Sequence, residues 1–285
     1  MHNFTFLGLP ENPETAEVVF IPAPYDATTS YKAGTREGPR RILEASRYLE
    51  FYDEETKTEI YRHKGFLTLA EPDLPVEPGK ALMALEKMIK PYLDRGLFPV
   101  LLGGEHTVSL AAIKLLKDKH PDLCLLQIDA HADLRFRYQD CLLSHACVMR
   151  RALELGLEIF PVGIRSLSKE EADFIEEKGL RLYWAREAVT KPKAVAEEIA
   201  RSVGERPLYV SIDLDGLDPS EVPGVGTPEP GGLKWYDLLE ILRVIARETK
   251  VIGFDVVELL PLAHDHRSEF LAARLIYKFL SYLFS

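Results

Sequence analysis

Six side chains that can bind metal ions follow three apolar segments of this chain; they are His106, Asp129, His131, Asp133, Asp213 and Asp215. The three from Asp129 to Asp133 alternate along the sequence, and alternate side chains of extended backbone point to the same side. Asp213 repeats this spacing with the aspartate two residues on, and His106 follows the third apolar segment. Turn formation or helix capping would explain one such motif but not three, so the pattern predicts a metal site.

The chemistry of this ligand set indicates two ions rather than one. Four carboxylates balance the charge of two divalent cations, which leaves little uncompensated charge in the protein interior. Oxygen-rich ligation with two imidazoles and no thiolate suits Mn²⁺, with Fe²⁺, Co²⁺ and Ni²⁺ as alternatives. A water molecule shared by two such ions is acidified towards hydroxide and becomes a nucleophile at neutral pH. We therefore expect a hydrolase that binds two Mn²⁺, or two other divalent ions, per subunit.

The segments that position these side chains alternate between apolar, strand-like runs and helix-like stretches. Strands are expected at 17–22, 65–70, 98–102, 123–128, 158–164, 179–184, 207–212 and 250–257. Helices are expected at 38–50, 79–95, 107–119, 144–156, 168–178, 191–203, 234–248 and 268–284. This alternation predicts parallel strands joined by crossover helices, in a three-layer α/β/α fold with a largely parallel central sheet of about eight strands. In such sheets ligands bind beyond the carboxyl ends of the strands, where the predicted metal ligands lie.

Composition narrows the class of protein. The chain has no internal repeat and no Gly/Ser-rich linker, so residues 1–285 are expected to form a single domain. A formal net charge of −10 disfavours binding to nucleic acids or anionic membranes. Three cysteines without zinc-ribbon spacing indicate a reducing compartment. Because no apolar run approaches the ~20 residues that a membrane span needs, we expect a cytoplasmic protein.

Further motifs are spread over almost the whole chain, at 24–26, 34–39, 103–106, 129–133, 144–145, 211–219, 226–232 and 255–258. Together they resemble the ureohydrolase family, which includes arginase and agmatinase, and the pair Glu229–Pro230 is similar to the agmatinase form. Glu105 stands where the family usually has Asp, a conservative change that is not expected to touch a metal ligand. The resemblance implies an arginase-like fold and an enzyme that hydrolyses a small cationic guanidino compound.

The resemblance also implies a division of the six predicted metal ligands between two sites. Asp129 and Asp213 would bridge the two ions. His106 and Asp133 would complete one site, and the two remaining ligands would complete the other.

Two further matched residues would act on the substrate. Glu258 would hold the guanidinium, because the planar fork of N–H donors matches a carboxylate. His145 would serve as a proton shuttle that protonates the departing amine, and the ordinary pKa of histidine suits that work. Through the same resemblance we expect a homo-oligomer, either a trimer or a hexamer.

The expected reaction is the hydrolysis of agmatine to putrescine and urea, a step of polyamine biosynthesis. N1-aminopropylagmatine, which would give spermidine, is an alternative that differs only in the length of its tail. Guanidinobutyrate is a third candidate, suggested by Arg135 and Arg137 unless these point to solvent or pair with Asp140. Residues 134–143 lack the small polar set with which arginase binds the amino-acid group, so arginine is disfavoured. A single-metal deacetylase is also disfavoured, because it needs only one Asp-His-Asp site.

Overall fold

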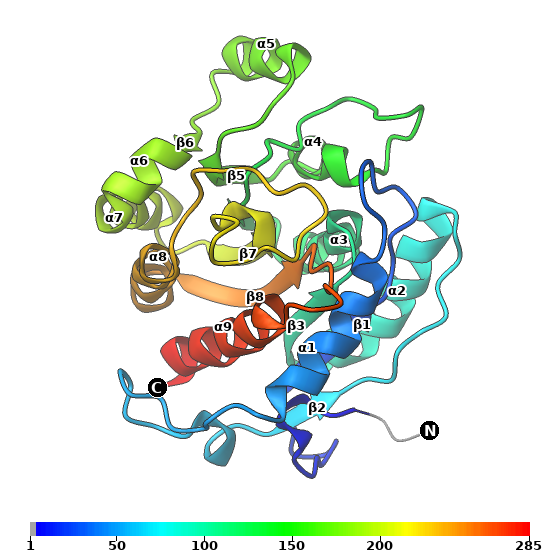
Figure 1. Cartoon of the computed structure of the whole chain (residues 1–285), viewed down its shortest axis with the longest axis vertical. Helices are drawn as coiled ribbons and strands as arrows, with labels where there is room; N and C mark the ends of the chain where they lie inside the picture. The colour runs from blue at the N-terminus through cyan, green and yellow to red at the C-terminus, as the bar shows by residue number, and fades with distance from the viewer. Residues whose placement is uncertain (1–3) are drawn as a thin grey trace.

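One eight-stranded sheet is the central feature of the computed structural model, which describes residues 4–285. Its strands are β1 (Val18–Ala23), β2 (Phe66–Thr68), β3 (Phe98–Gly103), β4 (Cys124–Ile128), β5 (Glu158–Ile164), β6 (Tyr183–Trp184), β7 (Pro207–Asp213) and β8 (Lys250–Val257). They lie in the order β2-β1-β3-β8-β7-β4-β5-β6, and each neighbouring pair is parallel (Figure 1). The predicted α/β fold with a parallel sheet of about eight strands is confirmed.

Nine α-helices lie in the described part of the chain: α1 (Gly38–Ser46), α2 (Pro78–Asp94), α3 (Ser109–Lys119), α4 (Val148–Glu154), α5 (Lys169–Lys178), α6 (Ala185–Thr190), α7 (Pro192–Val203), α8 (Trp235–Glu248) and α9 (Arg267–Phe284). The sequence does not predict α6, whose six residues are too few for a helical pattern to repeat. The strand predicted at 179–184 shortens to β6, because Gly179 ends α5 in the left-handed conformation with φ 63°.

Two helices begin differently from their predicted boundaries. The helix expected over 107–119 starts as a separate 3-10 turn, η4 (His106–Val108), before α3. The helix expected over 144–156 likewise starts as η5 (His145–Cys147) before the short α4. Each of these turns begins with a histidine that the sequence singles out, His106 in η4 and His145 in η5.

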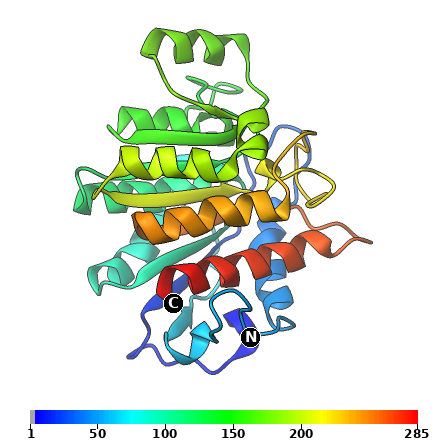
Figure 2. The same ribbon diagram turned by 90° about the vertical axis from the view of Figure 1, so that its left-hand side faces the viewer.

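Each face of the sheet packs into its own hydrophobic core. On β3, Val100 and Leu102 contribute to a core with α1, α7, α8 and α9, whereas Leu101 between them contributes to a core with α2, α3 and α4. The helices accordingly cover both faces of the sheet (Figure 1), and α7, α8 and α9 lie side by side across one face (Figure 2). Alternation of side chains along each strand therefore produces the predicted three layers.

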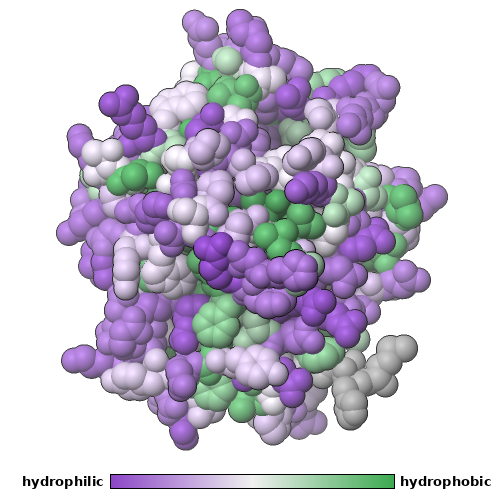
Figure 3. All heavy atoms as spheres, in the orientation of Figure 1, coloured by the Kyte–Doolittle hydropathy of each residue, from purple (hydrophilic) through white to green (hydrophobic). Residues whose placement is uncertain are grey.

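The surface shown in Figure 3 is mostly hydrophilic, with small hydrophobic patches between charged side chains. Within residues 4–285, no helix is both long enough and apolar enough to cross a membrane.

A buried lysine ties the segment before β2 to the last helix. Lys278 on α9 has a side chain that is only 3% exposed, and its Nζ lies 2.9 Å from the carboxylate of Asp53. The carboxylates of Glu54 and Glu55 lie 2.9 and 3.1 Å from the same nitrogen. Asp53 is 1% exposed, so its charge depends on this ammonium for compensation. The cluster therefore holds residues 53–55 against α9.

We predict that Lys278→Met destabilises the fold by about 3–5 kcal/mol, because it leaves a buried carboxylate without its cation. The matched control is Lys64→Met, which removes the 2.7 Å ion pair with the half-exposed Glu17 and should cost no more than about 1 kcal/mol. Equilibrium unfolding in denaturant measures both losses. Equal, small losses in the two variants would contradict the structural role of the Lys278 cluster.

Candidate active site

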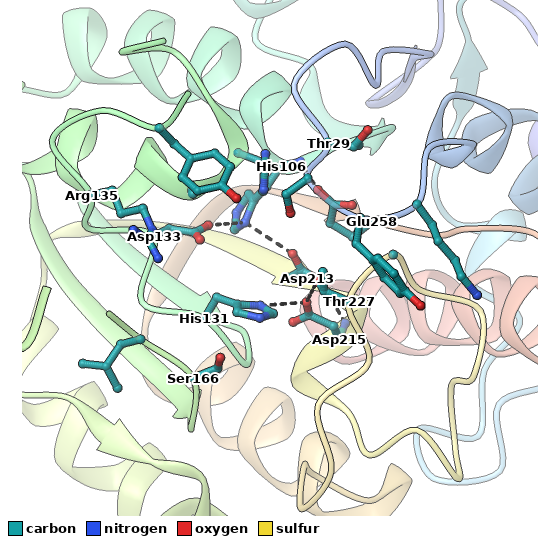
Figure 4. A pocket seen from close by; sticks show the side chains of 18 of the residues that line it. Thr29, His106, His131, Asp133, Arg135, Ser166, Asp213, Asp215, Thr227 and Glu258 are labelled. Carbon is teal, nitrogen blue, oxygen red and sulfur yellow. Dashed lines mark hydrogen bonds and ion pairs between the residues drawn. The ribbon is translucent and has the colours of Figure 1, made fainter. Parts of the chain in front are cut away.

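The predicted metal ligands come together at the carboxyl edge of the sheet. His106, Asp129 and Asp213 each offer a ligand atom within 4.8 Å of the other two, and Asp129, His131 and Asp215 form a second such group. Figure 4 shows His106 and Asp213 of the first group and His131 and Asp215 of the second. Asp129 belongs to both groups, so the two clusters share a carboxylate. This is the arrangement that a pair of adjacent cations needs.

Asp133, the sixth predicted ligand, joins the first group. Its Oδ2 lies 3.0 Å from Nδ1 of His106, and carboxylate oxygens of Asp129 and Asp213 lie 3.2 and 3.5 Å from the same nitrogen. In the second group, Nδ1 of His131 lies 2.9 Å from Oδ2 of Asp215. The structure thus brings all six predicted ligands together.

Four consecutive strands of the sheet supply this edge: β3, β8, β7 and β4. His106 follows β3, Glu258 follows β8, Asp213 ends β7, and Asp129 follows β4. Because the strands are parallel, their carboxyl ends meet at one edge, as the sequence predicts. A glycine permits the close approach of chains at this edge: a Cβ on Gly104 would lie 1.9 Å from the carbonyl oxygen of Tyr25.

The hydrogen bonds around His106 prepare it as a metal ligand. Ser211 donates its hydroxyl proton to Asp255 Oδ1 at 2.7 Å, and Nε2 of His106 lies 2.9 Å from the same hydroxyl oxygen. A hydroxyl has one proton to donate, so the serine oxygen accepts from Nε2–H of the histidine. In the neutral ring Nδ1 is then unprotonated, and it faces the three carboxylates with no hydrogen-bond partner in the described chain. An unprotonated nitrogen among carboxylates fits a cation between them.

Sequence reasoning does not assign roles to these supporting residues. Ser211 and Asp255 are opposite each other in the register of β7 and β8, which the sequence alone does not reveal. Gln127 is a third supporting residue, and its amide donates to Asp129 Oδ2 at 2.8 Å and to the carbonyl of His131 at 3.1 Å. One sequence signal could have identified Gln127 and Ser211 as supporting residues. Each is a polar residue two positions before an aspartate in an otherwise apolar strand, and alternate side chains of a strand share a face.

Burial and mutual repulsion dominate the electrostatics of the cluster. Burial raises the pKa of Asp213 well above its ordinary value, and the charges of Asp215 and Asp129 raise it further. Burial also raises the pKa of Asp133 to about 7, with the charge of Asp129 adding to the effect. Carboxyl groups packed this closely are stable as anions only if positive charge lies between them. The donor set therefore fits divalent cations.

Glu258 and His145 line the same cavity, which has a volume of about 190 Å³. Glu258 follows β8 with a positive φ of 64°, and its Oε1 accepts the backbone N–H of His106 at 2.7 Å. Burial raises its pKa well above the ordinary value, and the charge of Glu105 adds to the effect. Burial lowers the pKa of His145 to about 4. The cavity thus holds a buried carboxylate that forms no ion pair within the described part of the chain, and a histidine that favours its neutral form.

The two arginines of the loop after Asp133 lie in different surroundings. Arg135 lines the cavity, with its guanidinium 5.1 Å from the ring centre of Tyr138 and 3.8 Å from Oε2 of Glu171. Arg137 is exposed, and its guanidinium lies 3.9 Å from Asp140. Only the first is placed to influence what enters the cavity.

Arg165, which follows β5, ties together the backbone around the second cluster. Its guanidinium donates to six carbonyl oxygens at 2.7–3.3 Å, those of Gly163, Asp215, Gly216, Leu217, Glu229 and Pro230. Asp215 is a candidate metal ligand, and Glu229 and Pro230 belong to the loop beside it. The planar guanidinium therefore joins the end of β5 to two separate segments of the site.

A parallel α/β sheet with two overlapping Asp/His clusters at its carboxyl edge defines a metal-dependent hydrolase. Residues 16–281 match the sequence model of the arginase family. The chain belongs to the arginase family, which confirms the resemblance drawn from its motifs.

Relatives match over nearly the full length of the chain. It is 42% identical to an N(1)-aminopropylagmatine ureohydrolase from Synechocystis, over 94% of this chain and 89% of that protein. It is 39% identical to an agmatinase from Bacillus anthracis, over 90% and 87% of the two chains. Among solved structures, the agmatine ureohydrolase of Thermoplasma volcanium superposes with a TM-score of 0.90 at 30% identity, covering 99% of this chain and 95% of the other.

We predict that Arg165→Lys lowers the stability of the fold by about 2 kcal/mol or more, because an ammonium cannot reproduce the fork of charged hydrogen bonds. Cleavage by proteases should become faster between residues 216 and 233. The matched control is Arg181→Lys, since that arginine is half-exposed and pairs with Glu187. Thermal unfolding and limited proteolysis compare the two variants, and equal behaviour would show that Arg165 does not hold the segments together.

Proposed function

We propose that this enzyme hydrolyses agmatine to putrescine and urea, with two Mn²⁺ bound at the paired Asp/His clusters. The observation that carries the proposal is the position of Glu258, a buried carboxylate that has no ion-pair partner among residues 4–285 and lies in the cavity that both clusters line. N1-aminopropylagmatine, which would give spermidine, is the second candidate, supported by the 42% identity to the Synechocystis enzyme of that name.

The two ions would share Asp129 and Asp213. His106 and Asp133 would complete one site, and His131 and Asp215 would complete the other. Oxygen and imidazole donors without thiolates suit Mn²⁺. When bound, the ions supply positive charge that lowers the pKa of water and stabilises charge developing on the substrate. Two complete sites support a ureohydrolase over a deacetylase with a single metal ion.

Glu258 is suited to bind the guanidinium. One oxygen of its carboxylate already accepts the backbone N–H of His106, which fixes the plane of the group. The other oxygen can accept from the substrate, and a planar cation restores the charged form that burial disfavours. The positive φ of Glu258 is a strained conformation for a residue with a side chain, as found at sites where position matters more than stability.

His145 is suited to move a proton to the departing amine nitrogen. A guanidinium resists nucleophiles, and the C–N bond breaks readily only when the leaving nitrogen receives a proton. Burial favours the neutral form of His145, so the ring can accept a proton and then release it to the stronger base. Its ring packs edge-on against Tyr138, with 5.7 Å between the ring centres. This contact limits rotation of the imidazole.

The surroundings of the cavity favour a substrate without a carboxylate. Arg135 is held between Glu171 and Tyr138, and Arg137 is exposed. Lys32 also lines the cavity, but it is exposed, and its ammonium lies over the ring of Tyr31. A carboxylate on the tail of arginine or guanidinobutyrate would therefore lose water without gaining a buried cationic partner, at a cost of roughly 1–3 kcal/mol. This supports agmatine and its aminopropyl derivative over acidic guanidines.

Asp213→Asn tests the metal-binding part of the proposal. The variant removes a charge that both ions would share, and we predict fewer than two ions per chain and a kcat lower by about 100-fold or more. Asp118→Asn, which changes an exposed aspartate of α3, is the control and should retain two ions. Elemental analysis and urea release measure both properties. Two tightly bound ions and full activity in Asp213→Asn would overturn the assignment.

A panel of guanidines tests the substrate. We predict that kcat/KM for agmatine or N1-aminopropylagmatine exceeds that for arginine by about 10-fold or more, and that guanidinobutyrate is also poor. The double variant Arg135→Ala, Arg137→Ala should keep this order of preference. If arginine or guanidinobutyrate is the best substrate, the reaction type stands but the assignment to agmatine-type compounds fails.

A further inference from the structure

A buried carboxylate lies behind His145 and reaches it through a threonine. Glu105 is fully buried, and its Oε1 accepts the hydroxyl of Thr28 at 2.5 Å. The same threonine oxygen lies 3.3 Å from Nδ1 of His145 and accepts the backbone N–H of His145 at 3.1 Å. The three residues come from segments far apart in the sequence. A chain of contacts thus runs from a buried carboxylate to the imidazole.

The direction of each hydrogen bond follows from counting protons. Glu105 also accepts the backbone N–H of Thr28 at 2.7 Å and the hydroxyl of Thr107 at 2.8 Å. Oε2 accepts the backbone N–H, and Oε1 accepts both hydroxyls, so the ionised carboxylate is the acceptor in all three bonds. The single hydroxyl proton of Thr28 is therefore used by Glu105. What Thr28 offers His145 is a lone pair, which only a protonated Nδ1 can use.

We propose that Glu105 and Thr28 are positioning residues that hold neutral His145 in the tautomer with its proton on Nδ1. Nε2, on the far side of the ring, then carries the lone pair that accepts a proton in the cavity. The inference rests on the proposed role of His145 as a proton shuttle. It adds the residues that keep Nε2 of the ring free to accept a proton. This is the logic by which a carboxylate orients a catalytic imidazole elsewhere, with a threonine hydroxyl placed between the two groups.

The proton balance of the step is simple. Nε2 accepts one proton from the water consumed in hydrolysis and gives that proton to the departing amine nitrogen as the C–N bond breaks. The other proton of that water leaves the oxygen of the newly formed urea and is taken up by the stronger base, the released amine, which departs as an ammonium. The proton on Nδ1 stays in place, and neither Thr28 nor Glu105 gains or loses one. While the ring is cationic, the dipole of the Thr28 hydroxyl and the charge of Glu105 behind it stabilise the imidazolium.

A second hydroxyl competes for the same nitrogen. Ser144 Oγ also lies 3.3 Å from Nδ1 of His145. Its proton is not committed to another acceptor in the described chain, so Ser144 can donate or accept and does not select a tautomer. The selection therefore comes from Thr28, whose proton is committed to Glu105.

Nitrogen-15 NMR of the full-length chain, labelled with ¹⁵N-histidine and loaded with diamagnetic Mg²⁺, tests the tautomer directly. Signals of His145 are identified by their loss in His145→Gln. We expect the wild type and Ser144→Ala to carry the proton on Nδ1. A wild-type ring with its proton on Nε2 would overturn the inference, as would a change of tautomer in Ser144→Ala.

Two substitutions in the chain of contacts give the sharper test. In Glu105→Gln the amide oxygen must still accept the N–H of Thr28, so the amide NH₂ faces the Thr28 hydroxyl and donates to it. The hydroxyl proton is released towards His145, and we expect the tautomer to switch to Nε2–H. Thr28→Val removes the acceptor and should leave a mixture of tautomers, whereas Thr28→Ser keeps the hydroxyl and should keep the wild-type form. Unchanged spectra in both Glu105→Gln and Thr28→Val would overturn the inference.

Kinetics separate positioning from a general loss of structure. Thr28→Val should lower kcat for the best guanidine by about 10- to 100-fold with KM changed by less than threefold, and Thr28→Ser should restore most of the rate. Equal kcat in Thr28→Val and wild type would count against the inference. If the wild type hydrolyses no guanidine, the proposed function fails, but the spectra still decide the tautomer because they require no substrate.

Discussion

The electrostatic repulsion among buried carboxylates is the constraint on which this structure depends. Asp129, Asp133, Asp213 and Asp215 are each 5% exposed or less, and their oxygens surround two imidazole nitrogens at short distance. Anions so close together in a poorly solvated interior are unfavourable unless cations lie between them. The four carboxylates therefore destabilise the fold when no cation is bound and stabilise it when two divalent ions are bound. Metal binding and the integrity of this edge of the sheet are therefore linked.

The fold meets this constraint with a backbone that several interactions hold in place around the site. Parallel strands bring the candidate ligands to one edge, Arg165 ties together the carbonyls around Asp215, and the hydroxyl of Ser211 lies within hydrogen-bond distance of Nε2 of His106. Two residues at the edge, Asp133 and Glu258, have positive φ values of 53° and 64°. Such strain persists only where the surroundings determine the conformation, and it is concentrated at functional sites. The stability of the two hydrophobic cores offsets it.

The fold and the candidate metal ligands can be predicted from the sequence because both follow local rules. Asp129 and Asp133 are recognised from spacing along one strand end, and parallel strands place such ends together. The contacts that tune the site follow different rules. Ser211 meets Asp255 through strand register, and Thr28 meets Glu105 across 77 residues. These pairs depend on tertiary packing, and a single sequence does not show which distant residues pack together.

The most direct test of the account is a crystal structure of the full chain soaked in Mn²⁺, with anomalous scattering recorded to locate the ions. The account predicts two peaks of similar height on either side of the Asp129 carboxylate, about 3.5–4 Å apart. One peak would contradict the central claim that the shared carboxylate holds a pair of ions, and so would two peaks that lie too far apart to share Asp129.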